Sequence, residues 1–207
     1  MNPLVALLVS SALMFSAAET KPAVKARRPG EPTPTPAAFS TTPTERCGVS
    51  VSLPPGWQAE VTETRHTLPT CTFGLLPPGY AEFSARSEVE RNPYPVTVVL
   101  SHAGVEQAAS SGGFVTREGK WYVTGRAGSE TEASRMEGKG WYGISGTPNI
   151  GMHFKAGAYA GLGDTRRVLV VGPNNRCAVL DVSVVEYQEA FGRILASFRF
   201  LDAPGSK

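Results

Sequence analysis

From residue 47 onward, hydrophobic and polar residues alternate in short stretches that prolines and glycines separate. Alternation puts every second side chain on one face of an extended chain, so it predicts strands with one buried face. The Pro-Pro-Gly turn at 54–56 makes the second of these stretches a return strand. An unbroken run of mostly β-branched residues at 96–100 predicts a central strand covered on both faces. The other strands predicted in this way are 47–53, 57–61, 71–75, 167–171, 177–184 and 198–201.

Glycine-rich segments predict how some of these strands are connected. Gly-Pro-Asn-Asn at 172–175 is turn chemistry, and it predicts a hairpin between 167–171 and 177–184. Two similar aromatic pieces, 119–125 and 138–146, are expected to be paired strands with equivalent roles.

A 3.6-residue period of hydrophobic positions appears near the C-terminal end and predicts a helix. Ser183 and Glu186 precede its apolar face with the spacing of a capping box. Ser129 and Glu132 share that spacing, and Gly138 fits a helix stop, so a short helix is expected there as well. Strands and helices together predict an α+β fold, an antiparallel-rich sheet with packed helices. The apolar face of the C-terminal helix consists of Tyr187, Phe191, Ile194, Leu195 and Phe198.

The first 45 residues differ in composition from the rest of the chain. Residues 1–18 are uncharged and apolar and have small residues at Ser16 and Ala18, which is typical of a secretory signal peptide cleaved near Ala18. The apolar run is too short to span a bilayer, so no transmembrane segment is expected after cleavage. Residues 19–45 are rich in Pro and Thr, and they predict a disordered, semi-stiff tether. One domain is expected over 46–203, in the periplasm or outside the cell.

Two segments bracket this expected domain, GVSVSLPPGW at 48–57 and FGRILASFRF at 191–200. The first resembles the opening strand and turn of the PsbP-like superfamily, and the second resembles its closing helix and strand. The resemblance implies the α/β/α sandwich of the extrinsic photosystem II subunit and of many exported bacterial proteins. Members of that superfamily are mostly assembly, binding or interaction proteins with no shared catalytic residue, so the resemblance implies a binding role.

Three cysteines in an exported chain predict one disulfide and one remaining thiol. Cys47 and Cys71 each begin a predicted strand and share the phase of its apolar residues, so both point toward the core. Cys177 has the opposite phase from Leu180 and Val182. We therefore expect a Cys47–Cys71 disulfide, worth about 3 kcal/mol of stability.

Composition and spacing argue against several classes of function. A net charge of +2, with 18% charged residues, gives no basic surface of the kind that binds nucleic acid. The histidines, His66, His102 and His153, lack metal-ligand spacing, and no C-x-x-C pair exists. The glycine-rich segment 157–163 matches neither a dinucleotide nor a P-loop motif. No metal and no cofactor is therefore expected.

Ser145 lies in a Gly-Ile-Ser-Gly segment that is similar to the nucleophile turn of serine hydrolases. Thr147 stands where that motif has its last glycine. Ser145, His153 and Asp164 supply the residue types of a hydrolytic triad. A small envelope hydrolase that uses Ser145 and His153 is therefore one alternative function.

The two Trp-Tyr pairs, Trp121-Tyr122 and Trp141-Tyr142, are the candidate ligand or partner surface. Adjacent strand residues point to opposite faces, so one ring of each pair can fill the core while the other meets solvent or a helix. Exposed rings stack on sugars or anchor partner proteins. The expected function is a non-enzymatic binding or interaction module of the cell envelope with an unidentified protein partner. A carbohydrate or cell-wall binder, with envelope polysaccharide as its partner, is a further alternative, and so is a purely structural role for all four rings.

Overall fold

The computed structural model describes residues 40–44, 47–62, 70–101, 103–157, 159–163 and 165–201. All of them belong to the second of two units into which the chain divides, 36–207. The expected signal peptide and residues 19–39 of the expected tether lie outside the described residues. Among the residues that are described, no helix is long and apolar enough to cross a membrane.

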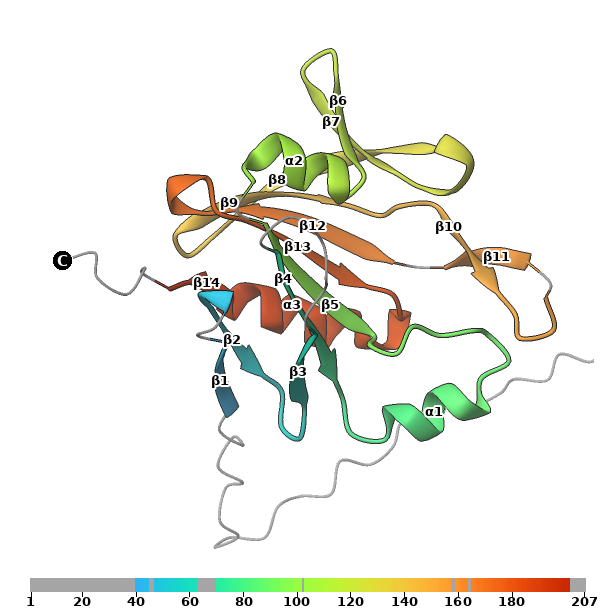
Figure 1. Ribbon diagram of the computed structural model, residues 1–207. Helices are drawn as coiled ribbons and strands as arrows, with labels where there is room; N and C mark the ends of the chain where they lie inside the picture. The colour runs from blue at the N-terminus through green and yellow to red at the C-terminus, as the bar shows by residue number, and fades with distance from the viewer. Residues whose placement is uncertain are drawn as a thin grey trace, which may run out of the picture. The chain divides into compact units, whose positions relative to one another are not determined.

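An antiparallel sheet of nine strands forms the centre of the fold (Figure 1). Its strands lie in the order β3-β4-β5-β13-β12-β9-β8-β7-β6. The predicted C-terminal hairpin is confirmed, and it occupies the middle of the sheet between two meanders that precede it in the chain. The strands are β3 (Gln58–Thr62), β4 (Thr70–Leu76), β5 (Val96–Ser101), β6 (Phe114–Arg117), β7 (Lys120–Thr124), β8 (Glu130–Gly138), β9 (Trp141–Gly146), β12 (Arg166–Val171) and β13 (Cys177–Val182).

Two smaller sheets and three α-helices complete the described part of the chain, so the fold is α+β as predicted. Three strands form the first small sheet, β1 (Ser40–Thr44), β2 (Val49–Leu53) and β14 (Arg199–Phe200), and two form the second, β10 (Ile150–His153) and β11 (Tyr159–Gly163). The helices are α1 (Tyr80–Arg86), α2 (Val105–Ser111) and α3 (Gln188–Ser197). The 3₁₀ turns are η2 (Arg126–Gly128), η3 (Pro173–Asn175) and η4 (Val185–Tyr187).

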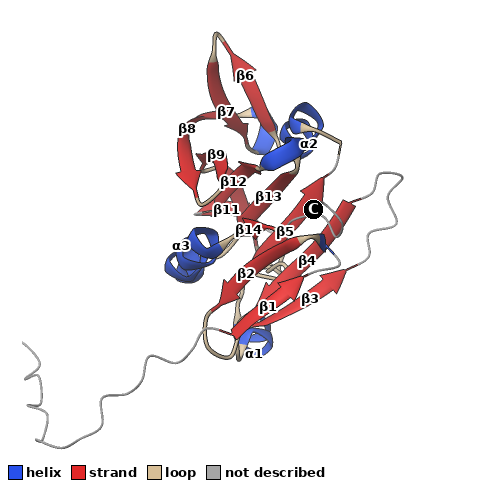
Figure 2. Ribbon diagram, turned by 90° about the vertical axis from the view of Figure 1, so that its left-hand side faces the viewer, coloured by secondary structure: helices blue, strands red, loops and turns tan. Residues whose placement is uncertain are grey.

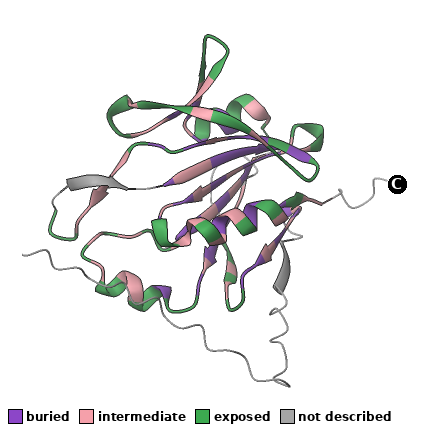
Figure 3. Cartoon of the chain, turned by 180° about the vertical axis from the view of Figure 1, so that it is seen from behind, coloured by how far each residue is buried: buried purple, intermediate pink, exposed green. Residues whose placement is uncertain are grey.

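The large sheet carries a hydrophobic core on each face, with α3 on one side and α2 on the other (Figure 2). Strand β12 shows how the sequence divides between them, because Val168 and Val170 enter the α3-side core while Leu169 and Val171 enter the α2-side core. Buried positions gather in the central strands and on the inner side of α3, whereas the β6–β7 hairpin is largely exposed (Figure 3). The α3-side core also includes β2, so the small sheet helps to close that face.

The Cys47–Cys71 disulfide is present, with the Cα atoms 5.5 Å apart. Cys47 lies two residues before β2, and Cys71 lies in β4, so the bond joins the small sheet to the large one. Cys177 is the remaining thiol, and it is buried in the α2-side core. Strand phase therefore identified the pairing correctly, because the two bonded cysteines share one core and the third faces the other.

Three strands differ from the prediction, one in its existence, one in its pairing partner and one in its burial. The tether prediction is wrong at its end, because residues 40–44 form β1, where a Thr-rich segment pairs with the free edge of β2. The return strand at 57–61 is β3, but it pairs with β4 and not with the strand before it. Strand β5 is fully buried on only one face, since Thr97, Val99 and Ser101 remain partly exposed.

The short helix expected after Ser129 is wrong, because Glu130–Gly138 is strand β8. Strands β7 and β9 flank β8 and satisfy its backbone, which outweighs a capping pattern with no apolar helix face behind it. The two aromatic pieces are consequently separated by β8 and are not paired. At the C-terminal helix, no side chain caps the first turn of α3, and the Ser183 hydroxyl donates to Pro95 O at 3.4 Å instead.

Candidate functional site

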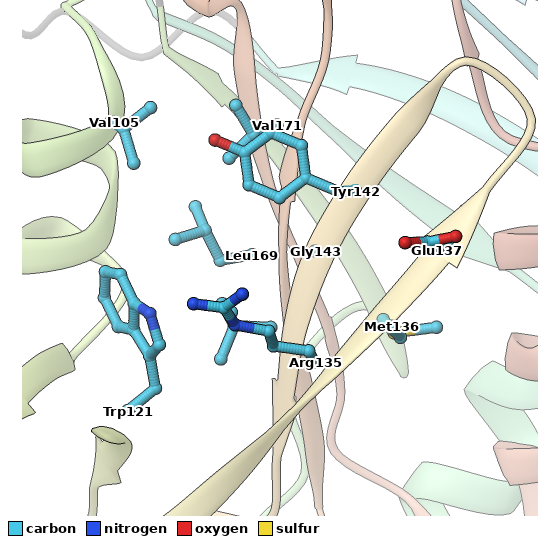
Figure 4. A pocket seen from close by; sticks show the side chains of 10 residues that line it. Val105, Trp121, Arg135, Met136, Glu137, Tyr142, Gly143, Leu169 and Val171 are labelled. Atoms are coloured by element: carbon cyan, nitrogen blue, oxygen red, sulfur yellow. The ribbon is translucent and has the colours of Figure 1, made fainter. Parts of the chain in front are cut away.

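A cavity of about 500 Å³ lies on the α2 side of the sheet (Figure 4). Its floor is aliphatic, because Ile144 and Leu169 are cross-strand neighbours on β9 and β12 and both are almost fully buried. Val171 extends this floor, and Val105 of α2 stands on the opposite wall. Strand alternation produces this arrangement, since residues two apart on a strand share a face.

Two aromatic side chains flank the aliphatic floor. Tyr142 lies two residues before Ile144 on β9, and 54% of its surface is exposed. Trp121 comes from β7, is half-buried, and packs against the α2-side core. Figure 4 shows the Trp121 and Tyr142 rings on either side of Leu169, so the site combines an apolar base with aromatic rings.

Arg135 is the cationic residue of the cavity. It lies on β8 opposite Ile144, and its guanidinium reaches toward Trp121 (Figure 4). Two cations on the neighbouring strands β6 and β7 are paired with carboxylates of β8. Arg117 lies 2.6 Å from Glu130, and Lys120 lies 3.4 Å from Glu132. Within the described part of the chain, Arg135 has no hydrogen-bond or ion-pair partner, so its charge is available to a ligand.

The four predicted aromatic residues do not form a single surface. Trp121 and Tyr142 line the cavity together. Trp141 is buried in the opposite core, where its Nε1 donates to Phe198 O at 3.0 Å. Tyr122 follows Trp121 on β7 and does not line the cavity, since neighbouring strand residues point to opposite faces. The structure thus brings together one ring from each Trp-Tyr pair.

Arg135 and the aliphatic floor are the parts of this site that sequence analysis missed. The floor residues read as ordinary core positions, and their opening into a cavity depends on how α2 is placed. Arg135 lies on a strand with several exposed charged residues, so nothing in the local pattern distinguishes it from them. The usable signal was the spacing of Arg135 and Glu137 on one strand face, but β8 itself was expected to be a helix.

The residues of the alternative hydrolase have other partners. Ser145 accepts a hydrogen bond from Arg166 Nε at 3.0 Å. His153 Nδ1 forms a hydrogen bond with the carboxylate of Glu90. Asp164, like His66 and His102, lies outside the described residues. In the described ranges, no three His, Cys, Asp or Glu side chains cluster in a way that suits a metal ion.

A smaller cavity of about 220 Å³ lies on the other side of α2, above β5 and β13. Arg167 and Asp181 form a half-buried ion pair at its edge, with 2.5 Å between Arg167 Nη2 and Asp181 Oδ2. Arg167 Nη1 also donates to Gly112 O at 3.1 Å, which ties the end of α2 to the sheet. Both charges are thus already used within the fold, so this cavity is a weaker candidate for binding.

A scan of the chain against models of protein families finds no match. A search of curated proteins likewise finds no sequence similar enough to identify a relative. The feature of the molecule that bears on function is therefore the cavity lined by Trp121, Arg135 and Tyr142, which we call the aromatic cleft.

Proposed function

We propose that this chain is an exported binding module of the cell envelope and that it binds its ligand in the aromatic cleft. The observation that carries the proposal is the cleft itself, with an aliphatic floor, two flanking rings and a cation, Arg135, that forms no ion pair with any described residue. Ligand sites in proteins are typically concave and mostly apolar, with a few polar groups that fix orientation. Tyr142 is among the few large apolar side chains exposed in the described residues, and it lies at this site.

The proposed location, in the periplasm or outside the cell, is supported by two features. The first 18 residues have the pattern of a secretory signal, and the Cys47–Cys71 disulfide suits an oxidising compartment. Membership of the PsbP-like superfamily is part of the same proposal. Helices on both faces of an antiparallel sheet are compatible with it, and a binding role is what that resemblance implies.

The hydrolase alternative has less support. The hydroxyl of Ser145 is held by a guanidinium, which donates hydrogen bonds and cannot act as a general base. A binding role needs a concave site with apolar and polar side chains, and the aromatic cleft has both.

The test uses N-phenyl-1-naphthylamine, a neutral naphthalene probe whose fluorescence rises in apolar surroundings. We expect saturable binding to the mature wild-type protein. Tyr142→Ala should weaken it about fivefold, because one ring contact is worth roughly 1 kcal/mol. Val105→Trp should prevent it by filling the cleft from the α2 side.

Tyr122→Ala is the matched control, since it removes the same side chain from a position that does not line the cleft. It should bind the probe as the wild type does. Absence of saturable binding to the wild type, or equal binding by all variants, would overturn the proposal.

A further inference from the structure

We infer that the aromatic cleft selects monocarboxylates with an apolar or aryl body, and that Arg135 binds the carboxylate. The inference rests on the proposed function, because it assigns a ligand class to the same site. Three parts of the cleft support it, namely Arg135, the aliphatic floor of Ile144 and Leu169, and the end of the cleft at Glu137.

The Arg135 end of the cleft favours one anionic group. Arg135 is exposed and has no partner in the part of the chain that the structure describes, whereas Arg117 and Arg167 each pair with a carboxylate. In both pairs, an acidic side chain accepts hydrogen bonds from the guanidinium. Arg117 binds both carboxylate oxygens of Glu130 through Nε and Nη2. A ligand carboxylate can form the same bidentate interaction with Arg135, and such charge-assisted pairs are strong and directional.

The floor of the cleft favours an apolar body over a sugar. Ile144 is 3% exposed and Leu169 is fully buried, and neither side chain can donate or accept a hydrogen bond. Sugar hydroxyls placed against them would lose water without gaining a partner, which costs free energy. An aryl or acyl body would instead bury the apolar surface that Tyr142 and Trp121 expose beside this floor.

The far end of the cleft favours a single carboxylate over two. Glu137 lines the same cavity and lies opposite Tyr142 across the strands. It has no ion-pair partner among the described residues. A second anionic group on the ligand would add negative charge to a cleft that already holds this carboxylate, and like charges repel.

The experiment is displacement of N-phenyl-1-naphthylamine by matched competitors at neutral pH. The competitors are 1-naphthoate, its neutral amide 1-naphthamide, the dianion naphthalene-1,4-dicarboxylate, and galacturonate as a sugar carboxylate. For the wild type we expect 1-naphthoate to displace the probe at about tenfold lower concentration than 1-naphthamide. The dianion should be weaker than 1-naphthoate, and galacturonate should not displace the probe.

Arg135→Gln should remove the preference for 1-naphthoate over 1-naphthamide while the neutral probe still binds. Arg199→Gln is the control, because it removes an exposed arginine on β14, away from the cleft, and it should keep the preference. Equal potency of acid and amide on the wild type, or an unchanged preference in Arg135→Gln, would overturn the inference.

The outcomes also separate this inference from the proposed function. If the neutral probe fails to bind the wild type, the cleft is not a ligand site and both ideas fail. If the probe binds in the cleft without any preference for the acid, only the assignment of Arg135 fails. Displacement by galacturonate as potent as that by 1-naphthoate would identify a carbohydrate site and contradict the apolar body.

Discussion

Trp141 shows at the scale of one residue why adjacent aromatic side chains have different roles here. Its indole donates to a backbone carbonyl in the α3-side core, while Tyr142 beside it faces the cleft. Room for the indole comes from Gly138, which lies opposite Trp141 on β8. A Cβ atom on Gly138 would come within 2.0 Å of the indole ring. A glycine that reads as a helix stop is therefore a packing position.

Gly138→Ala should lower the free energy of unfolding by about 1–3 kcal/mol, because the added methyl group displaces a buried ring. Urea denaturation followed by circular dichroism would measure the change. Gly192→Ala is the matched control, since a Cβ at this position of α3 meets nothing within 4 Å. Alanine there should stabilise the protein by about 0.5–1 kcal/mol, as it does in helices generally. Equal effects of the two substitutions would contradict this account of Gly138.

At the scale of elements, the sequence predicted those strands and turns whose signal lies within the element itself. Strands β2, β4 and β13 each have one buried face that alternates along the chain, so their existence could be read directly. The hairpin of β12 and β13 followed from its turn residues. Strand β8 could not be read, because its residues are exposed or half-buried throughout and show no hydrophobic period.

Pairing between elements was harder to predict than the elements themselves. Strand β5 lies beside β13, which follows it by many residues, and no local signal specifies that neighbour. The cleft depends on the same long-range order, because β8, β9 and β12 must be adjacent before their side chains form one surface. The sequence thus identified two of the cleft residues by their type, but not the companions that make a site.

The ion pair of Arg167 and Asp181 links three elements, since Arg167 of β12 also binds the backbone at the end of α2. Asp181 Oδ1 is buried and has no hydrogen-bond partner among the described residues. Arg167→Met would leave this carboxylate without its cation, and we expect a loss of about 2 kcal/mol in the free energy of unfolding, less than for a fully buried pair.

The double variant Arg167→Met/Asp181→Leu should recover most of that loss, because the unpaired charge is removed with its partner. Chemical denaturation of the wild type, both single variants and the double variant would give the coupling energy. Additive effects of the two substitutions would mean that the pair contributes nothing to stability.

At the scale of the whole molecule, the disulfide joins two sheets that share one core. The Cys47–Cys71 bond joins residues that are 24 positions apart in the sequence, and bonds of this kind stabilise mainly by restricting the unfolded chain. Cys177 is a different kind of cysteine, because burial raises the pKa of its thiol and so disfavours the reactive thiolate.

Thiol titration should distinguish these cysteines. We expect no reaction of the native protein, one thiol after denaturation, and three after denaturation with reduction. Reduction should also lower the free energy of unfolding by about 3 kcal/mol. The variant Cys47→Ser/Cys71→Ser should have this lower stability and show no further change on reduction. Three thiols in the denatured, unreduced protein would contradict the disulfide.

The order of strands in the large sheet has a consequence for how the chain folds. Strands β3 to β5 and strands β6 to β9 are two local meanders, and they meet only through the hairpin of β12 and β13. Until that hairpin has been synthesised, β5 and β9 each lack one neighbour, so the nascent chain holds two unfinished half-sheets with open edges. Closing the sheet last, by contacts distant in sequence, favours slow folding. A chain that is exported, as we propose, would therefore keep the edges of β5 and β9 unpaired until β12 and β13 have been made.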